Sequence, residues 1–221
     1  MEINEFLRES MKENEEEAKR YISEQKMKNL EKRFRNNGLP LLFRNKSFDN
    51  YDQKNNPNAY IKCKEFADNF PNSKGLLLSG SVGQGKTHLS AAIVNHLNDR
   101  MFQTYFGNVV DLISFVKSTY NKNSTLTEME AISIMTKKVD LLIIDDLGKE
   151  NNNEYTISLL YQIINKLYEN KKPVIITTNY NAYDLGNRLG ERGEAMVSRL
   201  CGMCEPVIFK GEDWRVKYGI F

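Results

Sequence analysis

A glycine-dense turn between two apolar segments constrains the fold of this chain more than any other stretch. From Gly80 to Thr87 it reads G-x-x-x-x-G-K-T, directly after an apolar run at 76–79. Glycines let the backbone turn sharply and direct several N–H groups inward, and the N-terminus of a following helix adds its dipole, so such a loop cradles anions. We therefore expect a nucleoside triphosphate here, with Lys86 at the β- and γ-phosphates and the Thr87 hydroxyl on Mg²⁺. The residues expected to bind it are Gly80, Ser81, Val82, Gly83, Gln84, Gly85, Lys86, Thr87 and His88.

Downstream of this turn, short apolar runs alternate with amphipathic segments. The pattern predicts strands at 76–79, 104–107, 141–145, 174–178 and 207–209, and helices at 86–97, 110–120, 127–137, 154–169 and 195–203. Strands that alternate with helices form a parallel sheet with helices on both faces. The predicted fold is therefore α/β, with a parallel five-stranded sheet between helices.

The remainder of the chain divides into an arm and a linker. The spacing of apolar residues in the segment 1–36 predicts one charged helix with a narrow apolar stripe. Its nine acidic and nine basic residues leave this segment without net charge. Such a helix could lie on its own domain or serve as an arm that docks a partner. Residues 37–74 predict a linker with a lead-in helix that begins near Asn58 and ends before Pro71. The main domain is expected at 75–221.

Composition excludes several classes of protein. The net charge of +2 is too small to indicate nucleic-acid binding by itself, so any such surface would be a local patch. Three cysteines do not form a disulfide framework, and we expect a cytoplasmic protein with no membrane segment. Cys201 and Cys204 have the spacing of a zinc or redox pair, but without a second pair we favour two small apolar residues on a helix.

Polar residues follow the two apolar runs after the glycine turn. The run at 141–144 leads into Asp145 and Asp146, and the run at 174–176 leads into Thr177, Thr178 and Asn179. Carboxylates at the carboxyl end of a central strand lie where an α/β sheet binds ligands. We expect Asp145 to hold Mg²⁺, by way of water, and Asp146 to orient the attacking water. Asn179 could contact the γ-phosphate or that water, although Asn-Tyr is also common turn chemistry.

Three arginines, Arg188, Arg192 and Arg199, fall in the segment RLGERGEAMVSRL, on a predicted helix. Arginine stabilises the charge that develops on a phosphoryl group in transfer, and one so far along the chain could act on the nucleotide of a neighbouring subunit. The alternative is that all three are solvated side chains.

The order of these motifs resembles that of AAA+ ATPases. More narrowly, residues 38–218 resemble the DnaC/DnaI-type bacterial replicative helicase loaders, through the segments LPLLFRNKSFDNY, GSVGQGKTHLSAAI, LLIIDDLGKE, LYQIINKLYENKKPVIITTN, GERGEAMVSRLCGMC and GEDWRVK. Transposition helper ATPases of the IstB type share much of this pattern. They usually show Asp-Glu-Leu-Gly-Tyr where this chain has the pair Asp145-Asp146 followed by Leu-Gly-Lys-Glu, which is more similar to the loaders.

The resemblance implies a role for each matching residue. Lys86 and Thr87 would form Walker A, Asp145 and Asp146 Walker B, and Asn179 sensor 1. The further implied nucleotide contacts are Arg199 as an arginine finger acting in trans, Arg215 near the second sensor, and Phe48 near the adenine. The helices between 110 and 138 would match an insertion that faces single-stranded DNA, with Lys117, Tyr120, Lys122, Lys137 and Lys138 as candidate contacts; a solvated helix face is the alternative.

Three functions remain open on this reading. The first is a helicase loader that binds ATP or ADP with Mg²⁺, a hexameric replicative helicase, single-stranded DNA and further copies of itself. Residues 1–36 would be its docking arm, and its ATPase would be slow and stimulated by DNA or oligomerisation. The second is a transposition helper that coats duplex DNA. The third is a small-molecule kinase, which the aspartate pair after a buried strand disfavours.

Overall fold

Five parallel strands form a single sheet in the computed structural model, which describes residues 21, 37–120, 124, 126–150, 153–213 and 216. The spatial order is β2-β3-β4-β1-β5. The strands are β1 (Gly75–Ser79), β2 (Thr104–Asn108), β3 (Leu141–Leu147), β4 (Val174–Thr178) and β5 (Cys204–Ile208). Every pairing in the sheet is parallel, so the predicted parallel five-stranded sheet is confirmed.

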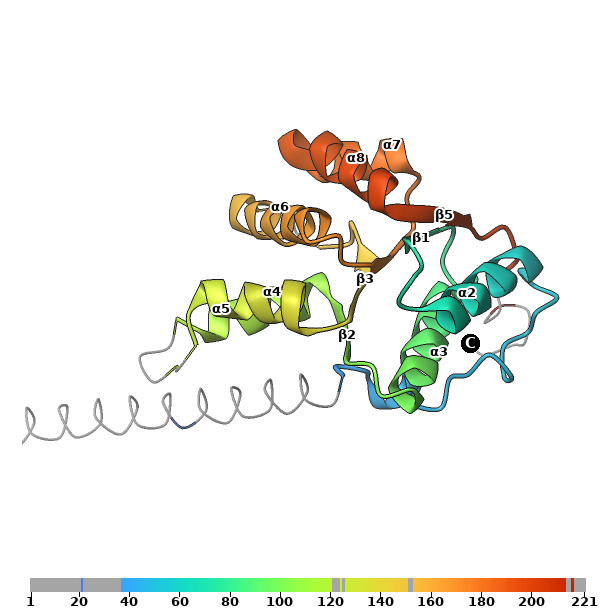
Figure 1. Cartoon of the computed structure of the whole chain (residues 1–221). Helices are drawn as coiled ribbons and strands as arrows, with labels where there is room; N and C mark the ends of the chain where they lie inside the picture. Colours follow the sequence, from blue (N-terminus) through green and yellow to red (C-terminus); the bar gives the residue numbers. More distant parts are fainter. Residues whose placement is uncertain are drawn as a thin grey trace, which may run out of the picture.

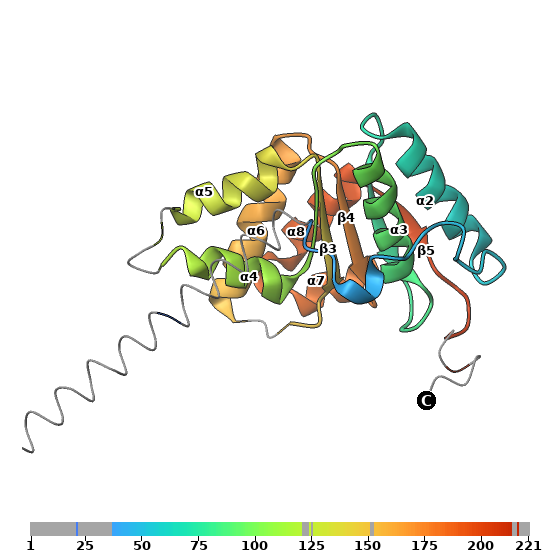
Figure 2. The same cartoon turned by 90° about the horizontal axis from the view of Figure 1, so that it is seen from below.

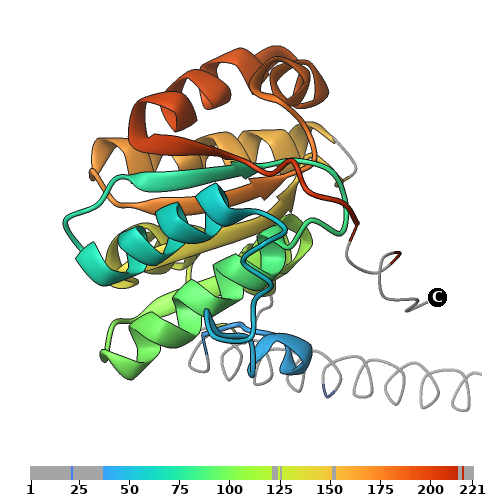
Figure 3. The ribbon, with the colours of Figure 1, turned by 90° about the vertical axis from the view of Figure 1, so that its right-hand side faces the viewer.

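Helices cover both faces of this sheet (Figure 1). One face carries α2 (Pro57–Asn69) and α3 (Lys86–Asp99), which lie in front of the strands in Figure 3. The other face carries α4 (Val109–Ser118), α5 (Glu128–Ser133), α6 (Glu154–Glu169), α7 (Ala182–Arg188) and α8 (Gly193–Met203). Seen from below, the strands stand between these two groups (Figure 2).

The alternation of side chains along each strand produces two hydrophobic cores. In β1, Leu76 and Leu78 pack with α2 and α3, whereas Leu77 between them packs with the helices of the opposite face. Successive side chains of a strand point to opposite faces, so a strand covered on both sides is apolar throughout. The uninterrupted run at 141–144 in β3 fits this arrangement, because all four of its side chains are fully buried.

Side-chain caps explain where several helices begin. Asn108 accepts a hydrogen bond from the N–H of Asp111 at the start of α4, and Thr127 accepts one from the N–H of Glu130 at the start of α5. Each acidic partner accepts in return from the backbone N–H of its cap, so two free donors are satisfied at each helix start. The two helices of the segment at 109–138 therefore begin at positions encoded locally.

Two segments differ from the helices expected. The single helix predicted through Arg188, Arg192 and Arg199 is three pieces: α7, a short 3-10 turn (η3, Gly190–Arg192) and α8. Gly190 has a left-handed φ of 72°, and a Cβ at Gly193 would lie 1.9 Å from the carbonyl oxygen of Gly186, so the glycines permit a tight reversal. The helix predicted at 127–137 ends in a π-turn (η2, Ile134–Lys138).

Within the described residues, no three His, Cys, Asp or Glu side chains gather where they could hold a metal ion. Cys201 lies exposed on α8, but Cys204 begins β5 and is buried, so the expectation that both lie on a helix is wrong for Cys204. In the part of the chain that the structure covers, no helix is both long and apolar enough to span a membrane.

Candidate nucleotide site

The glycine turn leaves β1 and enters α3 at the carboxyl edge of the sheet. Gly80, Gly83 and Gly85 have φ values of 150°, 77° and 92°, which residues with a Cβ rarely adopt. The ammonium of Lys86 folds back into the loop and donates to the carbonyl oxygens of Gly80 and Ser81, both at 2.7 Å. Its side chain is only 5% exposed, so the loop surrounds a positive charge.

Asp145 stands beside this loop at the end of β3. Its carboxylate accepts hydrogen bonds from the Thr87 hydroxyl at 3.1 Å and from the Thr177 hydroxyl of β4 at 2.7 Å. Burial raises the pKa of Asp145 from 3.8 to about 6, and the two hydroxyls oppose that rise because they stabilise the charged form. The structure thus brings together Thr87 and Asp145, the two residues predicted to hold Mg²⁺.

Asp146 follows a break in the strand pairing. The register between β3 and β4 shifts between Ile144 and Leu147, and Asp146 has a left-handed φ of 58°. The Thr177 hydroxyl accepts from the N–H of Asp146 at 2.8 Å, and the ammonium of Lys149 pairs with the Asp146 carboxylate at 2.8 Å. The bulge therefore turns the second carboxylate away from the sheet interior, and its side chain is 36% exposed.

Asn179 follows β4, the strand between β1 and β3. Its side-chain oxygen accepts from the Lys86 ammonium at 2.9 Å. The residue predicted as sensor 1 thus contacts Lys86 of the glycine turn directly. Such contacts are possible because the carboxyl ends of parallel strands meet at one edge of the sheet.

The lead-in segment encloses the loop from outside. The hydroxyl of Tyr51 and the side-chain amide of Asn56 both donate to the carbonyl oxygen of Gln84, at 3.4 and 3.2 Å. The side-chain oxygen of Asn56 in turn accepts from the N–H groups of Lys210 and Gly211, at 2.8 and 3.2 Å. Sequence reasoning missed Tyr51 and Asn56, because nothing in their spacing indicates contact with a loop about thirty residues away.

Phe48, expected near the adenine, is a buried core residue with 5% of its surface exposed. Its ring packs edge-on against Tyr60 and His96. The aromatic residue of this segment that reaches the loop is Tyr51, whose ring lies edge-on against His88 with 5.2 Å between the centroids. Burial lowers the pKa of His88, while its hydrogen bond to the Ser47 carbonyl opposes that change.

These residues fit a magnesium nucleotide. The hydroxyl of Thr87 and the carboxylate of Asp145 are oxygen donors, which Mg²⁺ prefers, and they lie within hydrogen-bond distance of each other. The glycine loop would lose its concave shape if side chains were added, since a Cβ at Gly85 would lie 2.7 Å from the Tyr51 ring. A buried ammonium within a loop at a helix start is suited to phosphate oxygens.

The three arginines lie in different places. Arg199, on α8, donates to the side chains of Asn165 and Tyr161 on α6, at 2.7 and 3.1 Å, and its guanidinium covers the Tyr161 ring. The Arg192 guanidinium also lies over this ring, 5.5 Å from its centroid. Arg188 instead donates to the carbonyl oxygen of Gly148 at 3.0 Å, in the turn that follows Asp146. By the hydrogen bonds described, Arg188 is therefore the one of these three arginines that contacts the turn after Asp146.

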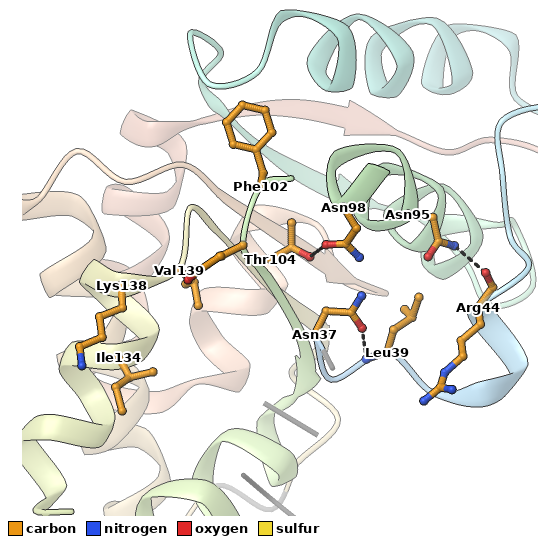
Figure 4. A pocket seen from close by; sticks show the side chains of 11 residues that line it. Asn37, Leu39, Arg44, Asn95, Asn98, Phe102, Thr104, Ile134, Lys138 and Val139 are labelled. Carbon is orange, nitrogen blue, oxygen red and sulfur yellow. Dashed lines mark hydrogen bonds between the residues drawn. The ribbon is translucent and has the colours of Figure 1, made fainter. Parts of the chain in front are cut away.

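The candidate DNA contacts fall into two groups. Lys117 lies in the last turn of α4 and Tyr120 just after that helix, both beside Tyr155 of α6. The Lys117 ammonium is 5.1 Å from the Tyr155 ring centroid, and the two tyrosine hydroxyls are 2.9 Å apart. Lys137 and Lys138 end the π-turn before β3. Lys138 lines one side of a cavity of about 840 Å³ with Arg44 on the other side (Figure 4).

Several predicted residues lie outside the described part of the chain. They are Lys122, Arg215 and, apart from Tyr21, the arm at 1–36. Their expected roles stay predictions.

Comparison with known sequences identifies relatives of this arrangement. A family profile described as IstB-like ATP binding protein matches residues 7–219. The replicative helicase loader DnaC of Escherichia coli strain K12 is 31% identical over 189 residues, which cover 84% of this chain and 76% of that protein.

Solved structures show the same fold. The crystal structure of the DnaC helicase loader superposes with a TM-score of 0.68 at 30% identity, over 77% of this chain and 100% of that one. The replication initiator DnaA bound to AMPPCP and single-stranded DNA superposes with a TM-score of 0.63 at 25% identity, over 76% of this chain and 50% of that one. The domain has the AAA+ P-loop fold, as the resemblance implied.

Proposed function

The chain belongs to the family of IstB-like ATP-binding proteins and is homologous to the DnaC loaders, and from this we propose that it loads a hexameric replicative helicase. One observation carries the proposal. The similarity to the loader spans 84% of the chain, so it extends well beyond the nucleotide loop that unrelated ATPases share.

ATP would act as the switch in this proposal. The phosphates would lie in the loop at 80–87 with Lys86 beside them, and Thr87 with Asp145 would hold Mg²⁺. Asp146 would orient the attacking water, and an aspartate there is shorter than the glutamate common in related ATPases, so turnover would be slow. A nucleotide shifts an equilibrium only through contacts that differ between states. Asn179, bonded to Lys86, is suited to such a contact because a γ-phosphate would compete for the same ammonium.

Fast hydrolysis would need a second copy of the chain. The described contacts of Arg199 are to α6 and α8, and none joins it to its own phosphate loop. We infer that Arg199 acts on the nucleotide of a neighbouring subunit, so an isolated chain would hydrolyse ATP slowly and oligomerisation or DNA would stimulate it.

Single-stranded DNA would bind along the segment at 109–138. Lys117, Tyr120, Lys137 and Lys138 combine positive charge with an aromatic ring, as single-strand binding requires, and Lys122 would join them. The similarity of the fold to an initiator bound to single-stranded DNA supports this assignment. Residues 1–36 would dock the helicase in the cytoplasm.

The test is a mass-resolved binding assay with the replicative helicase encoded in the same genome. With ATP and Mg²⁺ we expect a complex of defined mass that is lost when residues 1–36 are deleted. A matched control is Lys86→Ala in the full chain, which keeps the arm and removes the switch. If the full chain forms no complex in ATP, ADP or the absence of nucleotide, the loader proposal fails.

The family profile favours a second candidate, an ATPase helper of DNA transposition, because its description names the IstB proteins. Such a protein would assemble on duplex DNA in an ATP-dependent manner. Sedimentation with duplex and single-stranded DNA of equal length separates the two functions. Preference for the duplex, without a helicase complex, would favour the helper.

A further inference from the structure

Asn56 breaks an ordinary rule of helix capping. It is the N-cap residue of α2, where asparagine usually accepts a hydrogen bond from an N–H of the first turn. Its side chain makes no such bond. Instead, Asn56 is only 6% exposed and its side chain is directed to the glycine turn at 80–87. Its amide nitrogen donates to the Gln84 carbonyl, and its side-chain oxygen accepts from the N–H groups of Lys210 and Gly211. A helix start that forgoes its cap indicates another use for the side chain.

The contact to the Gln84 carbonyl also orients the next N–H of the loop. The peptide between Gln84 and Gly85 is planar and trans, so its C=O and N–H point in opposite directions. Two donors from the lead-in segment, Asn56 and Tyr51, hold the carbonyl. The N–H of Gly85 is consequently directed away from the lead-in segment.

Gly85 is fixed from its other side as well. Its own carbonyl accepts from the N–H of Leu89 at 3.0 Å, the first hydrogen bond of α3. A φ of 92° has a low steric cost only in glycine. Because glycine can also adopt many other backbone conformations, neighbouring residues must hold Gly85 in this one. Asn56 is well placed to do so, because its backbone carbonyl accepts from the N–H of Tyr60 and is thereby anchored in α2.

We propose that Asn56 is a positioning residue for nucleotide binding: through the Gln84 carbonyl it fixes the Gly85 N–H as a donor to a phosphate. The inference rests on the proposed ATP site and goes beyond it, since Asn56 itself touches no phosphate. The N–H groups of Lys210 and Gly211, in the segment after β5, bind the side-chain oxygen of Asn56. The Asn56 side chain therefore joins that segment to the loop.

The test compares ATP with tripolyphosphate, which has the phosphates without base or ribose. Asn56→Asp is nearly isosteric, keeps the acceptor for Lys210 and Gly211, and replaces the donor by an oxygen that repels the Gln84 carbonyl. We expect about tenfold weaker displacement of a fluorescent ATP analogue, as loss of a buried hydrogen bond implies, and the same factor for both competitors. Asn72→Asp, the same charge change at an exposed residue outside the site, is the matched control.

A second variant and an NMR measurement test the same contact to the Gln84 carbonyl independently. Tyr51→Phe removes the longer bond to the same carbonyl and should weaken tripolyphosphate binding by about twofold to threefold. The amide resonance of Gly85 in a ¹H–¹⁵N spectrum should move in both variants and stay in place in Asn72→Asp. If Asn56→Asp does not fold, Tyr51→Phe decides the matter by these same two measurements.

Three results would overturn the inference. Unchanged binding of tripolyphosphate in Asn56→Asp would mean that Asn56 does not act on a phosphate donor. Weakened ATP binding with normal tripolyphosphate binding would place its effect at the base or ribose. A wild-type chain that binds neither ligand would overturn the proposed ATP site as well, so the two failures are distinguishable.

Discussion

Removing the charge of Asp145 should stabilise the nucleotide-free protein above pH 6. The carboxylate is 9% exposed, and burial raises its pKa to about 6 from an ordinary value of 3.8. The folded state thus holds a proton on this group more strongly than the unfolded chain does. The substitution Asp145→Asn keeps the side-chain shape and an acceptor for the hydroxyls of Thr87 and Thr177, but cannot ionise.

The sign and the size of this difference in folding stability follow from the linkage between folding and proton binding. Because the folded pKa is raised, the stability contributed by the protonated form is full below about pH 3.8 and is lost as the pH rises through about 6. A difference of about two pH units corresponds to about 3 kcal/mol at 1.36 kcal/mol per unit, nearly all of it lost above pH 6. The advantage of Asp145→Asn over the wild type should therefore grow by about 2 kcal/mol between pH 4 and pH 8.

Urea denaturation in EDTA, repeated at four pH values between 4 and 8, measures this quantity. At pH 8 the variant should also melt about 5–10 °C above the wild type, given the size of the chain. Asp49→Asn, at an exposed position, is the matched control and should show no such growth. A stability difference that stays constant from pH 4 to pH 8 would refute the reasoning, since it would mean that Asp145 ionises in the folded state without cost.

Three further outcomes are expected. Lys86→Ala should abolish ATP binding or weaken it at least a hundredfold in a titration with a fluorescent analogue, and unchanged affinity would exclude the phosphate-loop assignment. Arg199→Ala should leave nucleotide binding intact and remove DNA- or oligomer-stimulated ATP turnover; normal stimulation in a turnover assay would exclude it as the finger. Charge reversal of Lys137 and Lys138 should weaken single-strand binding and reduce its salt dependence, measured by fluorescence anisotropy, and no change in either would place the DNA surface elsewhere.

The strands and most helices could be predicted from the sequence because their signals are local. The run at 141–144 is buried on both faces and is apolar at every position. The capping residues Asn108 and Thr127 mark helix starts within one turn. Predicted and observed bounds accordingly agree to within a few residues for β1 through β4.

The reversal between α7 and α8 was missed because its cause is a contact between two backbones. Gly193 approaches the carbonyl of Gly186 so closely that a side chain would clash, and periodicity carries no information about such an approach. The glycines at 186, 190 and 193 were visible in the sequence. Their spacing was a signal that the helical pattern of the neighbouring residues concealed.

At the site, the residue types could be predicted but their partners could not. The pairing of Asp145 with Thr177 depends on β3 lying beside β4, although the two strands are about thirty residues apart. The bulge that turns Asp146 outward likewise arises where the two strands lose register. Tyr51 and Asn56 reach the loop because the lead-in segment packs on α3, a tertiary arrangement without a local signature.

The cost of ionising Asp145 also couples metal binding to stability. A dication held by Thr87 and Asp145 would favour the charged carboxylate and so offset the desolvation that raises its pKa. The side chain in the Asp145→Asn variant cannot ionise, so it has no desolvation cost for a bound metal ion to offset. Magnesium with nucleotide should therefore stabilise the wild type more at pH 8 than at pH 5, and should stabilise Asp145→Asn by less at both. The same side chain that lowers the stability of the nucleotide-free protein would then make its folded state respond to the ligand.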